Sequence, residues 1–182
     1  MPANGMPTGT IHTMVRLDKV ASSYHGNMET VVNANADMDN GCIVMLGDLV
    51  PGEINAYQVR IPDANSILTD EVLLVKSPEF NGPNYYPNTT LKDFYNPQGS
   101  YARAYHLTVG DEFTITTNGI TGTPAVDQYL IPQAGSLQLT VAPNLSGGTR
   151  FAAKITNTNV SFGYVGSGLT KQSAITVKVV KA

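Results

Sequence analysis

Cysteine and tryptophan are nearly absent from this 182-residue chain, which has one cysteine and no tryptophan. With Cys42 as the sole cysteine, the chain can form neither an intrachain disulfide nor a cluster of thiolate metal ligands. Cys42 lies in an apolar run, so we expect a buried, unreactive thiol rather than a nucleophile. This cysteine usage fits a protein that folds in a reducing cytosol.

Charge and long apolar runs are also scarce. Charged residues make up 14% of the chain, well below the soluble average of about 25%. No apolar run approaches the roughly 20 residues of a membrane span, and the N-terminus lacks the basic and apolar regions of a signal peptide. Hydrophobic residues nevertheless reach 42% and are evenly spread, which predicts a folded, non-membrane protein of one domain or two small packed ones.

The few charges are unevenly distributed. All 14 carboxylates lie between Asp18 and Asp127, giving residues 1–127 a net charge of −8. The remainder has no carboxylate and a net charge of +5. This split could steer one copy onto another or onto an acidic partner, although a segment can also lack acids by chance. Five dispersed cations without interleaved aromatics make a poor nucleic-acid groove, so no nucleic-acid partner is expected.

What the chain does contain is a succession of short β-type segments. After residues 1–10, which read as an extended N-terminal arm, β-branched and aromatic runs arrive about every 10 to 15 residues, separated by turn residues. The predicted segments are TIHTMVRL, METVVNA, CIVML, AYQVRI, EVLLVK, ARAYHL, EFTIT, QYLIP, LQLTV, RFAAKITN, VSFGYV and AITVKVV. The sequence therefore predicts an all-β sandwich or barrel of short antiparallel strands.

Two local features refine this prediction. In YHLTVGDEFTIT a strand, a Gly-Asp turn and a second strand follow directly, which predicts a hairpin. Only NTTLKDFYNP looks helical, with Thr89 or Thr90 as its cap, so one short helix is expected near residues 90–95. Residues 11–182 form the β-rich body, which is either one unit or two packed subdomains, about 11–120 acidic and 121–182 basic.

The stretch ADMDNGCIVMLGD raises the question of a calcium site. Counted from Asp37, an EF-hand loop would need an oxygen ligand at position 5, glycine at position 6 and glutamate at position 12. The chain has Gly41, Cys42 and Asp48 there. The residues Asp39-Asn40-Gly41 are instead typical of a turn that leads into a buried strand.

The remaining motifs predict no catalytic or cofactor site. GYVGSGLTK lacks the Gly-Lys-Ser/Thr order of a phosphate-binding loop. His12, His25 and His106 show no ligand spacing, and no nucleophile elbow is present. We therefore expect no enzyme activity, no metal and no cofactor.

Tyrosines provide the candidate contact surface. Five lie within 21 positions, around a proline-rich connection, and tyrosine offers a large contact area with a polar rim. The alternative is that these rings cover the core next to a long loop. The candidate contact residues are Tyr85, Tyr86, Tyr95, Tyr101 and Tyr105, together with the cations Arg150, Lys154 and Lys171.

Between residues 36 and 117 the chain resembles a family of small head proteins of tailed bacteriophages and prophages. The resemblance rests on an Asn-Gly turn, a Gly-Glu-x-x-x-Tyr segment, a Ser-Pro-Glu, a Leu-x-x-Phe-x-Asn helix, an Ala-Arg-x-Tyr strand and a Gly-Asp-x-Phe hairpin. The matching positions are Asn40, Gly41, Gly52, Glu53, Tyr57, Ser77, Pro78, Glu79, Leu91, Phe94, Asn96, Ala102, Arg103, Tyr105, Gly110, Asp111 and Phe113.

This resemblance implies a decoration (cement) or auxiliary capsid protein that is made in the host cytoplasm and located on the virion. Its partner would be the major capsid protein, and the protein would itself be a homo-oligomer, with trimers common among decoration proteins. The alternative from another functional class is a receptor- or glycan-binding module of a head or tail fibre, in which tyrosines would form the aromatic platform.

Overall fold

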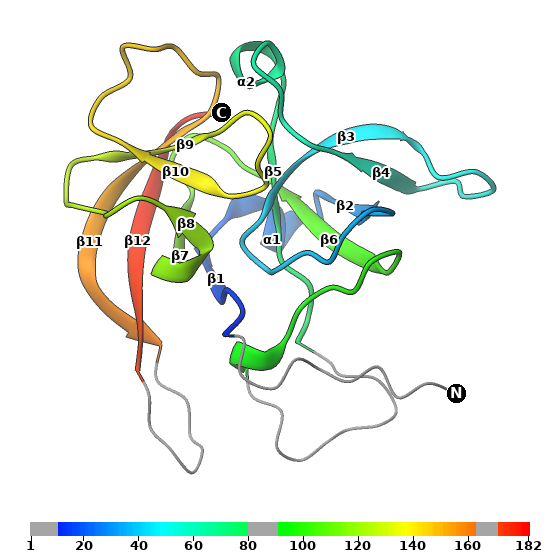
Figure 1. The fold of residues 1–182 in the computed structure, drawn as a ribbon, viewed down its shortest axis with the longest axis horizontal. Helices are drawn as coiled ribbons and strands as arrows, with labels where there is room; N and C mark the ends of the chain where they lie inside the picture. Colours follow the sequence, from blue (N-terminus) through cyan, green and yellow to red (C-terminus); the bar gives the residue numbers. More distant parts are fainter. Residues whose placement is uncertain (1–10, 80–90, 163–170) are drawn as a thin grey trace.

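The computed structural model of this protein describes residues 11–79, 91–162 and 171–182 and is mainly β (Figure 1). This confirms the predicted all-β class. The strands form a closed five-stranded barrel and a seven-stranded sheet. The predicted arm at residues 1–10 lies outside the described residues.

The barrel strands lie between residues 28 and 106. In order around the barrel they are β2 (Met28–Val32), β4 (Ala56–Arg60), β3 (Ile43–Leu49), β5 (Leu73–Val75) and β6 (Tyr101–His106), which returns to β2. The β2–β4 pair is parallel and the other pairs are antiparallel. Because the ring closes, the barrel has no free edge.

The seven-stranded sheet combines two early strands with those that follow residue 119. Its order is β1 (Val15–Lys19), β7 (Glu112–Thr116), β12 (Gln172–Lys181), β11 (Ala152–Phe162), β9 (Tyr129–Pro132), β10 (Leu139–Ala142) and β8 (Ile120–Thr121). The sheet thus takes strands from both sides of residue 120. The division into two subdomains stays a prediction.

Alternating side chains of the barrel strands build two cores. Val44, Leu73 and Val75 belong to the core inside the barrel. Their neighbours Ile43 and Leu74 belong to a second core, which they share with apolar residues of the sheet. Burial on both faces explains why CIVML and VLLV read as continuous apolar runs rather than alternating ones.

In the part of the chain that the structure describes, four short helical segments accompany the strands. The predicted helix near residues 90–95 is a 3₁₀ turn, η1 (Leu91–Asp93), and its proposed caps Thr89 and Thr90 lie outside the described residues. The sequence does not predict α1 (Ala21–His25), α2 (Ser66–Thr69) or the 3₁₀ turn η2 (Thr117–Gly119). The two α-helices have only five and four residues, too few for a periodic apolar pattern.

The hairpin predicted for YHLTVGDEFTIT is wrong. β6 pairs with β2 and β5 in the barrel, whereas β7 pairs with β1 and β12 in the sheet. The connection crosses between them because Gly110 N donates to Val179 O and Val179 N donates to Asp111 O. Asp111 Oδ1 also accepts from Ala21 N at 3.0 Å. The Gly-Asp turn is present, but hydrogen bonds to distant segments determine that β7 enters the sheet instead of pairing with β6.

A second correction concerns the segments predicted as RFAAKITN and VSFGYV. A single strand, β11, runs through both as far as Phe162. The pairing of β11 with β12 is irregular between Ile155 and Val160, where the sequence predicts a break between two strands. A bulge, rather than a turn, occupies this position.

Candidate functional site: contact surfaces

The aspartate-rich stretch is a turn, as predicted, and its carboxylates hold neighbouring segments together. Gly41 adopts a positive φ of 91°. Asp39 binds His12 Nδ1 at 2.7 Å and Thr13 N at 2.9 Å, and Asp37 accepts from Gln98 N at 2.7 Å. Within residues 11–79, 91–162 and 171–182, no group of three or more His, Cys, Asp or Glu side chains could hold a metal ion.

Cys42, expected to be a buried and unreactive thiol, is half-buried as a residue. It packs against the core of the barrel. Burial first, and then the negative charge of Asp39, raise the pKa of Cys42 to about 12. The thiol is therefore protonated at neutral pH and is a poor nucleophile.

The structure does not gather the described tyrosines into one surface. Tyr95 is stacked on His12, with ring centroids 4.8 Å apart, and Tyr105 packs against the core shared by barrel and sheet. Tyr101 is 58% exposed and donates its hydroxyl to Glu53 at 2.6 Å. Tyr85 and Tyr86 lie outside the described residues. Of the three described rings, only Tyr101 offers a broad exposed face.

The three candidate cations also lie apart. Arg150 donates through Nη1 to Thr69 O at 2.7 Å, and Lys154 forms an ion pair with Asp127 at 2.7 Å. Lys171 is exposed and directly precedes β12. Two of the three cations are therefore already engaged within the molecule.

The charge split seen along the chain becomes a split between the two β structures. Residues 28–106, which span the barrel, contain ten carboxylates and four cations, a net charge of −6. The rest of the chain contains four carboxylates and seven cations, a net charge of +3. Two of these four carboxylates lie beside cations of the same part of the chain: Asp127 forms an ion pair with Lys154, and Glu112 lies 4.0 Å from Lys178. The barrel is thus the acidic side of the molecule.

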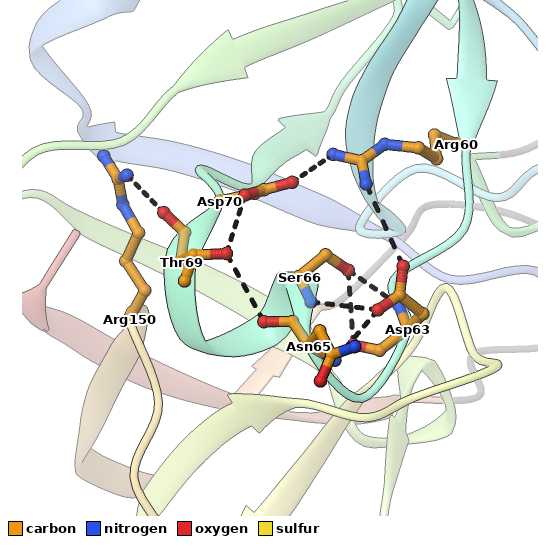
Figure 2. Close-up of polar contacts among 7 residues, drawn as sticks. All are labelled: Arg60, Asp63, Asn65, Ser66, Thr69, Asp70 and Arg150. Carbon is orange, nitrogen blue, oxygen red and sulfur yellow. Dashed lines mark hydrogen bonds and ion pairs between the residues drawn. The ribbon is translucent and has the colours of Figure 1, made fainter.

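A braced polar cluster surrounds α2, and Figure 2 shows its contacts. We call it the α2 corner, and its members are Arg60, Asp63, Asn65, Ser66, Thr69, Asp70 and Arg150. Asp63 Oδ1 accepts from the backbone N–H groups of Asn65 at 2.8 Å and Ser66 at 3.0 Å. Arg60 forms ion pairs with both Asp63 and Asp70 (Figure 2). The cluster therefore fixes a helix that is too short to be stable by itself.

Hydrogen bonds in the α2 corner lower the pKa values of its two carboxyl groups. Hydrogen bonds from the backbone N–H groups of Ser66 and Asn65 lower the pKa of Asp63 below its ordinary value. The hydrogen bond from Arg60, followed by that from Thr69, lowers the pKa of Asp70. Both groups stay ionised at neutral pH and brace a surface on which Leu68 is 50% exposed.

A second exposed apolar feature lies at the tip of the β3–β4 hairpin. This hairpin projects from the barrel in Figure 1. Ile54 in its loop is 91% exposed and Leu49 at the end of β3 is 45% exposed. Ile54 is not among the contact residues predicted from the sequence. An isoleucine inside a Pro-Gly-Glu-Ile-Asn turn was the available signal, because such turns otherwise hold polar residues.

Besides the short β8 at one end of the sheet, which pairs only with β10, two strands have edges that no described strand pairs. Among the described strands β1 pairs only with β7, so its other edge has no described strand partner. β11 pairs with β9 only at Ala153 and Lys154, and its exposed residues from 156 to 159 continue beyond that contact. Open backbone edges can add a strand from another chain.

His106 lies between two carboxylates at the barrel surface. Its Nδ1 is 2.8 Å from Glu71 Oε1 and its Nε2 is 3.5 Å from Glu29 Oε1. Burial, the largest single influence, lowers the pKa of His106, but the hydrogen bonds and charges of Glu71 and Glu29 together outweigh it and raise that pKa. Through these two contacts His106 links β6, β2 and the segment before β5.

Comparison with protein-family models, curated proteins and solved structures finds no match to this chain. Among the described residues, no helix is long and apolar enough to cross a membrane.

Proposed function

We propose that this protein is a structural protein of a bacteriophage head that decorates or cements the capsid by binding the shell of major capsid protein. In this proposal it is made in the host cytoplasm, assembles as a homo-oligomer and acts on the outside of the virion. Such a protein has no substrate. It needs modest contacts that symmetry repeats, and bridging several subunits can raise avidity by about 10²–10⁴.

The observation that best supports the proposal is the open edge of β1. The outer side of this strand lacks a described partner, and the strand follows within a few residues of the predicted arm. An arm and an edge strand together can pair with neighbouring chains by strand addition, which gives many backbone hydrogen bonds without a deep pocket. We propose that residues 1–19 form this capsid contact.

The residues behind the family resemblance offer further support. Asn40, Ser77 and Asn96 are each less than 7% exposed, and Asn40 is hydrogen-bonded to both of the others. These three positions of the pattern that resembles phage head proteins therefore help to hold the barrel together, whereas others, such as Glu53 and Arg103, are exposed. The buried part of the resemblance favours a shared fold.

The proposal is tested by co-sedimentation of the purified protein with expanded capsids that lack it. We expect saturable binding, and weaker binding at about 0.5 M salt if the charge split contributes, because screening is strong there. Deletion of residues 1–10 should lower capsid occupancy. Unchanged occupancy after this deletion would remove the arm from the contact but not the decoration role.

A matched pair of variants tests the role of charge. Lys171→Gln removes a cation with no ion pair to any described residue, whereas Lys154→Gln removes one already paired with Asp127. Electrostatic attraction to the shell predicts a larger loss of binding for Lys171→Gln. Absence of binding to capsids under all conditions would contradict the proposal and direct attention to glycans, with Tyr101→Ala as the first variant for a glycan array.

A further inference from the structure

A lysine, an asparagine and a glutamate converge where the chain leaves β5 and enters β3. Lys76 Nζ forms an ion pair with Glu79 Oε1, and Asn40 Nδ2 donates to the same oxygen at 3.3 Å. Both nitrogens also lie 3.1 Å from Ser77 O. Because they share this acceptor, the two nitrogens cannot lie farther apart than twice that distance.

The side-chain amide of Asn40 is also held at its oxygen. Asn40 Oδ1 accepts from Ser77 N at 2.8 Å and from Asn96 Nδ2 at 3.4 Å. Two N–H donors on a carbonyl oxygen polarise the carbonyl carbon and would stabilise negative charge developing on that oxygen. Asn40 is 1% exposed, so water competes little for these donors.

The surroundings of Lys76 and Glu79 suit proton exchange between them. Their side chains are 18% and 24% exposed, and Lys76 N is fixed by donating to Arg103 O at 2.9 Å. Glu79 can take a proton from the ammonium group of Lys76 and later give one to Asn40 Nδ2, because its Oε1 contacts both nitrogens. A nucleophile, an acid-base group and a polarised amide are thus present together.

We propose that Lys76 and Asn40 become joined by an intramolecular isopeptide bond, with Glu79 as the acid-base catalyst. Glu79 takes a proton from Lys76, and the neutral amine attacks Cγ of Asn40. Negative charge on Oδ1 is stabilised by the N–H groups of Ser77 and Asn96. Glu79 returns its proton to Nδ2 and accepts the excess proton from Nζ. The Cγ–Nδ2 bond then breaks, ammonia leaves and takes up the last proton as ammonium, and Glu79 is a carboxylate again.

This bond would covalently join the ends of two neighbouring strands of the barrel. Asn40 precedes β3 and Lys76 follows β5, which pair at Ile43 and Leu74. The link would close a loop of the chain and lower the entropy of the unfolded state, as other covalent cross-links do. The inference does not depend on the proposed capsid function.

Mass spectrometry of the purified full chain tests the inference. We expect the wild-type protein to be lighter than its sequence by one ammonia molecule and to give a branched proteolytic peptide containing residues 40 and 76. Lys76→Arg preserves the positive charge beside Glu79 but should have no mass deficit, and Glu79→Gln should have none or form the bond far more slowly. Lys19→Arg, at another lysine beside a glutamate, should retain the deficit.

Two results would overturn the inference. One is a wild-type protein at its full sequence mass with an unmodified peptide around Lys76. The other is an ammonia deficit that persists in Lys76→Arg, which would indicate cyclisation of an asparagine rather than attack by a lysine. Both readouts are covalent, so they remain interpretable even if a variant is less stable than the wild-type protein.

Discussion

Gly41, in the Asn40-Gly41 turn, is constrained both by its backbone conformation and by its close packing. Gly41 needs a positive φ, and it also lies beneath the sheet, where a Cβ would be 2.8 Å from Ile115 Cδ1 and 3.0 Å from Thr13 Cγ2. Ile115 is fully buried, so it has little room to move aside. The turn that resembles a calcium loop in sequence is therefore a packing contact between barrel and sheet.

Gly41→Ala should therefore destabilise the protein through both backbone strain and overpacking. The left-handed conformation costs about 1–2 kcal/mol and the clash about 1–3 kcal/mol. Gly52→Ala is the matched control, because its φ of 87° is nearly the same but nothing lies within 4 Å of the added Cβ. Chemical denaturation should show a larger loss of unfolding free energy for Gly41→Ala. Equal losses would mean that the close approach to Ile115 has no energetic effect.

His106 should make stability depend on pH near neutrality. Its pKa is raised above the ordinary 6.5 by Glu71 and Glu29, so its contribution is fully present below pH 6.5 and is lost as pH rises through the folded-state pKa. Between about pH 5.5 and about pH 8.5, the melting temperature of the wild type should fall relative to that of His106→Gln. His25→Gln, at an exposed histidine of α1, is the control and should follow the wild type.

At the scale of elements, the sequence predicts strands far better than their partners. The residues of β6 and β7 alternate and flank a Gly-Asp turn, yet they belong to different β structures because Val179 and Ala21 hold the connection. Those partners are distant in the chain, so no local pattern contains them. The same limit applies to the contact surface, because Tyr95 and Tyr105 gain their neighbours only through folding.

The α2 corner should weaken in acid. The pKa values of Asp63 and Asp70 lie below the ordinary 3.8, so their contribution is present above that value and is lost as pH falls through the folded-state pKa values. We expect Asp63→Asn with Asp70→Asn to flatten the fall in melting temperature below about pH 4. Asp48→Asn, at a carboxylate outside the corner, should leave the acid profile unchanged.

For the whole molecule, the shared core predicts that barrel and sheet unfold together. Ile43, Leu74, Ile115 and Ile155 belong to one buried cluster although they come from both β structures. Separating the barrel from the sheet would expose all of these side chains to water, at a cost of about 25 cal/mol per Å² of apolar surface. We therefore expect the acidic barrel and the more basic sheet to unfold as one cooperative unit.

Ile115→Ala is the test of this cooperativity. Its expected cost is about 2–5 kcal/mol, because it leaves a cavity in the shared core. Far-UV circular dichroism and tyrosine fluorescence should report the same, lowered midpoint, as two-state unfolding requires. Val31→Ala, inside the barrel alone, should shift the midpoint by both probes as well. Separate transitions in either variant would contradict a single cooperative unit.

The strand order β1-β7-β12 has a consequence for synthesis on the ribosome. All five barrel strands precede residue 107, whereas β12, which lies between β7 and β11, spans residues 172–181. A nascent chain can therefore close its barrel early but cannot complete the sheet until its last strand has emerged. During that interval the side chains of Ile43, Met45 and Leu74 are not yet covered by the complete sheet. Premature termination would therefore leave an intermediate with exposed apolar side chains that is prone to aggregation.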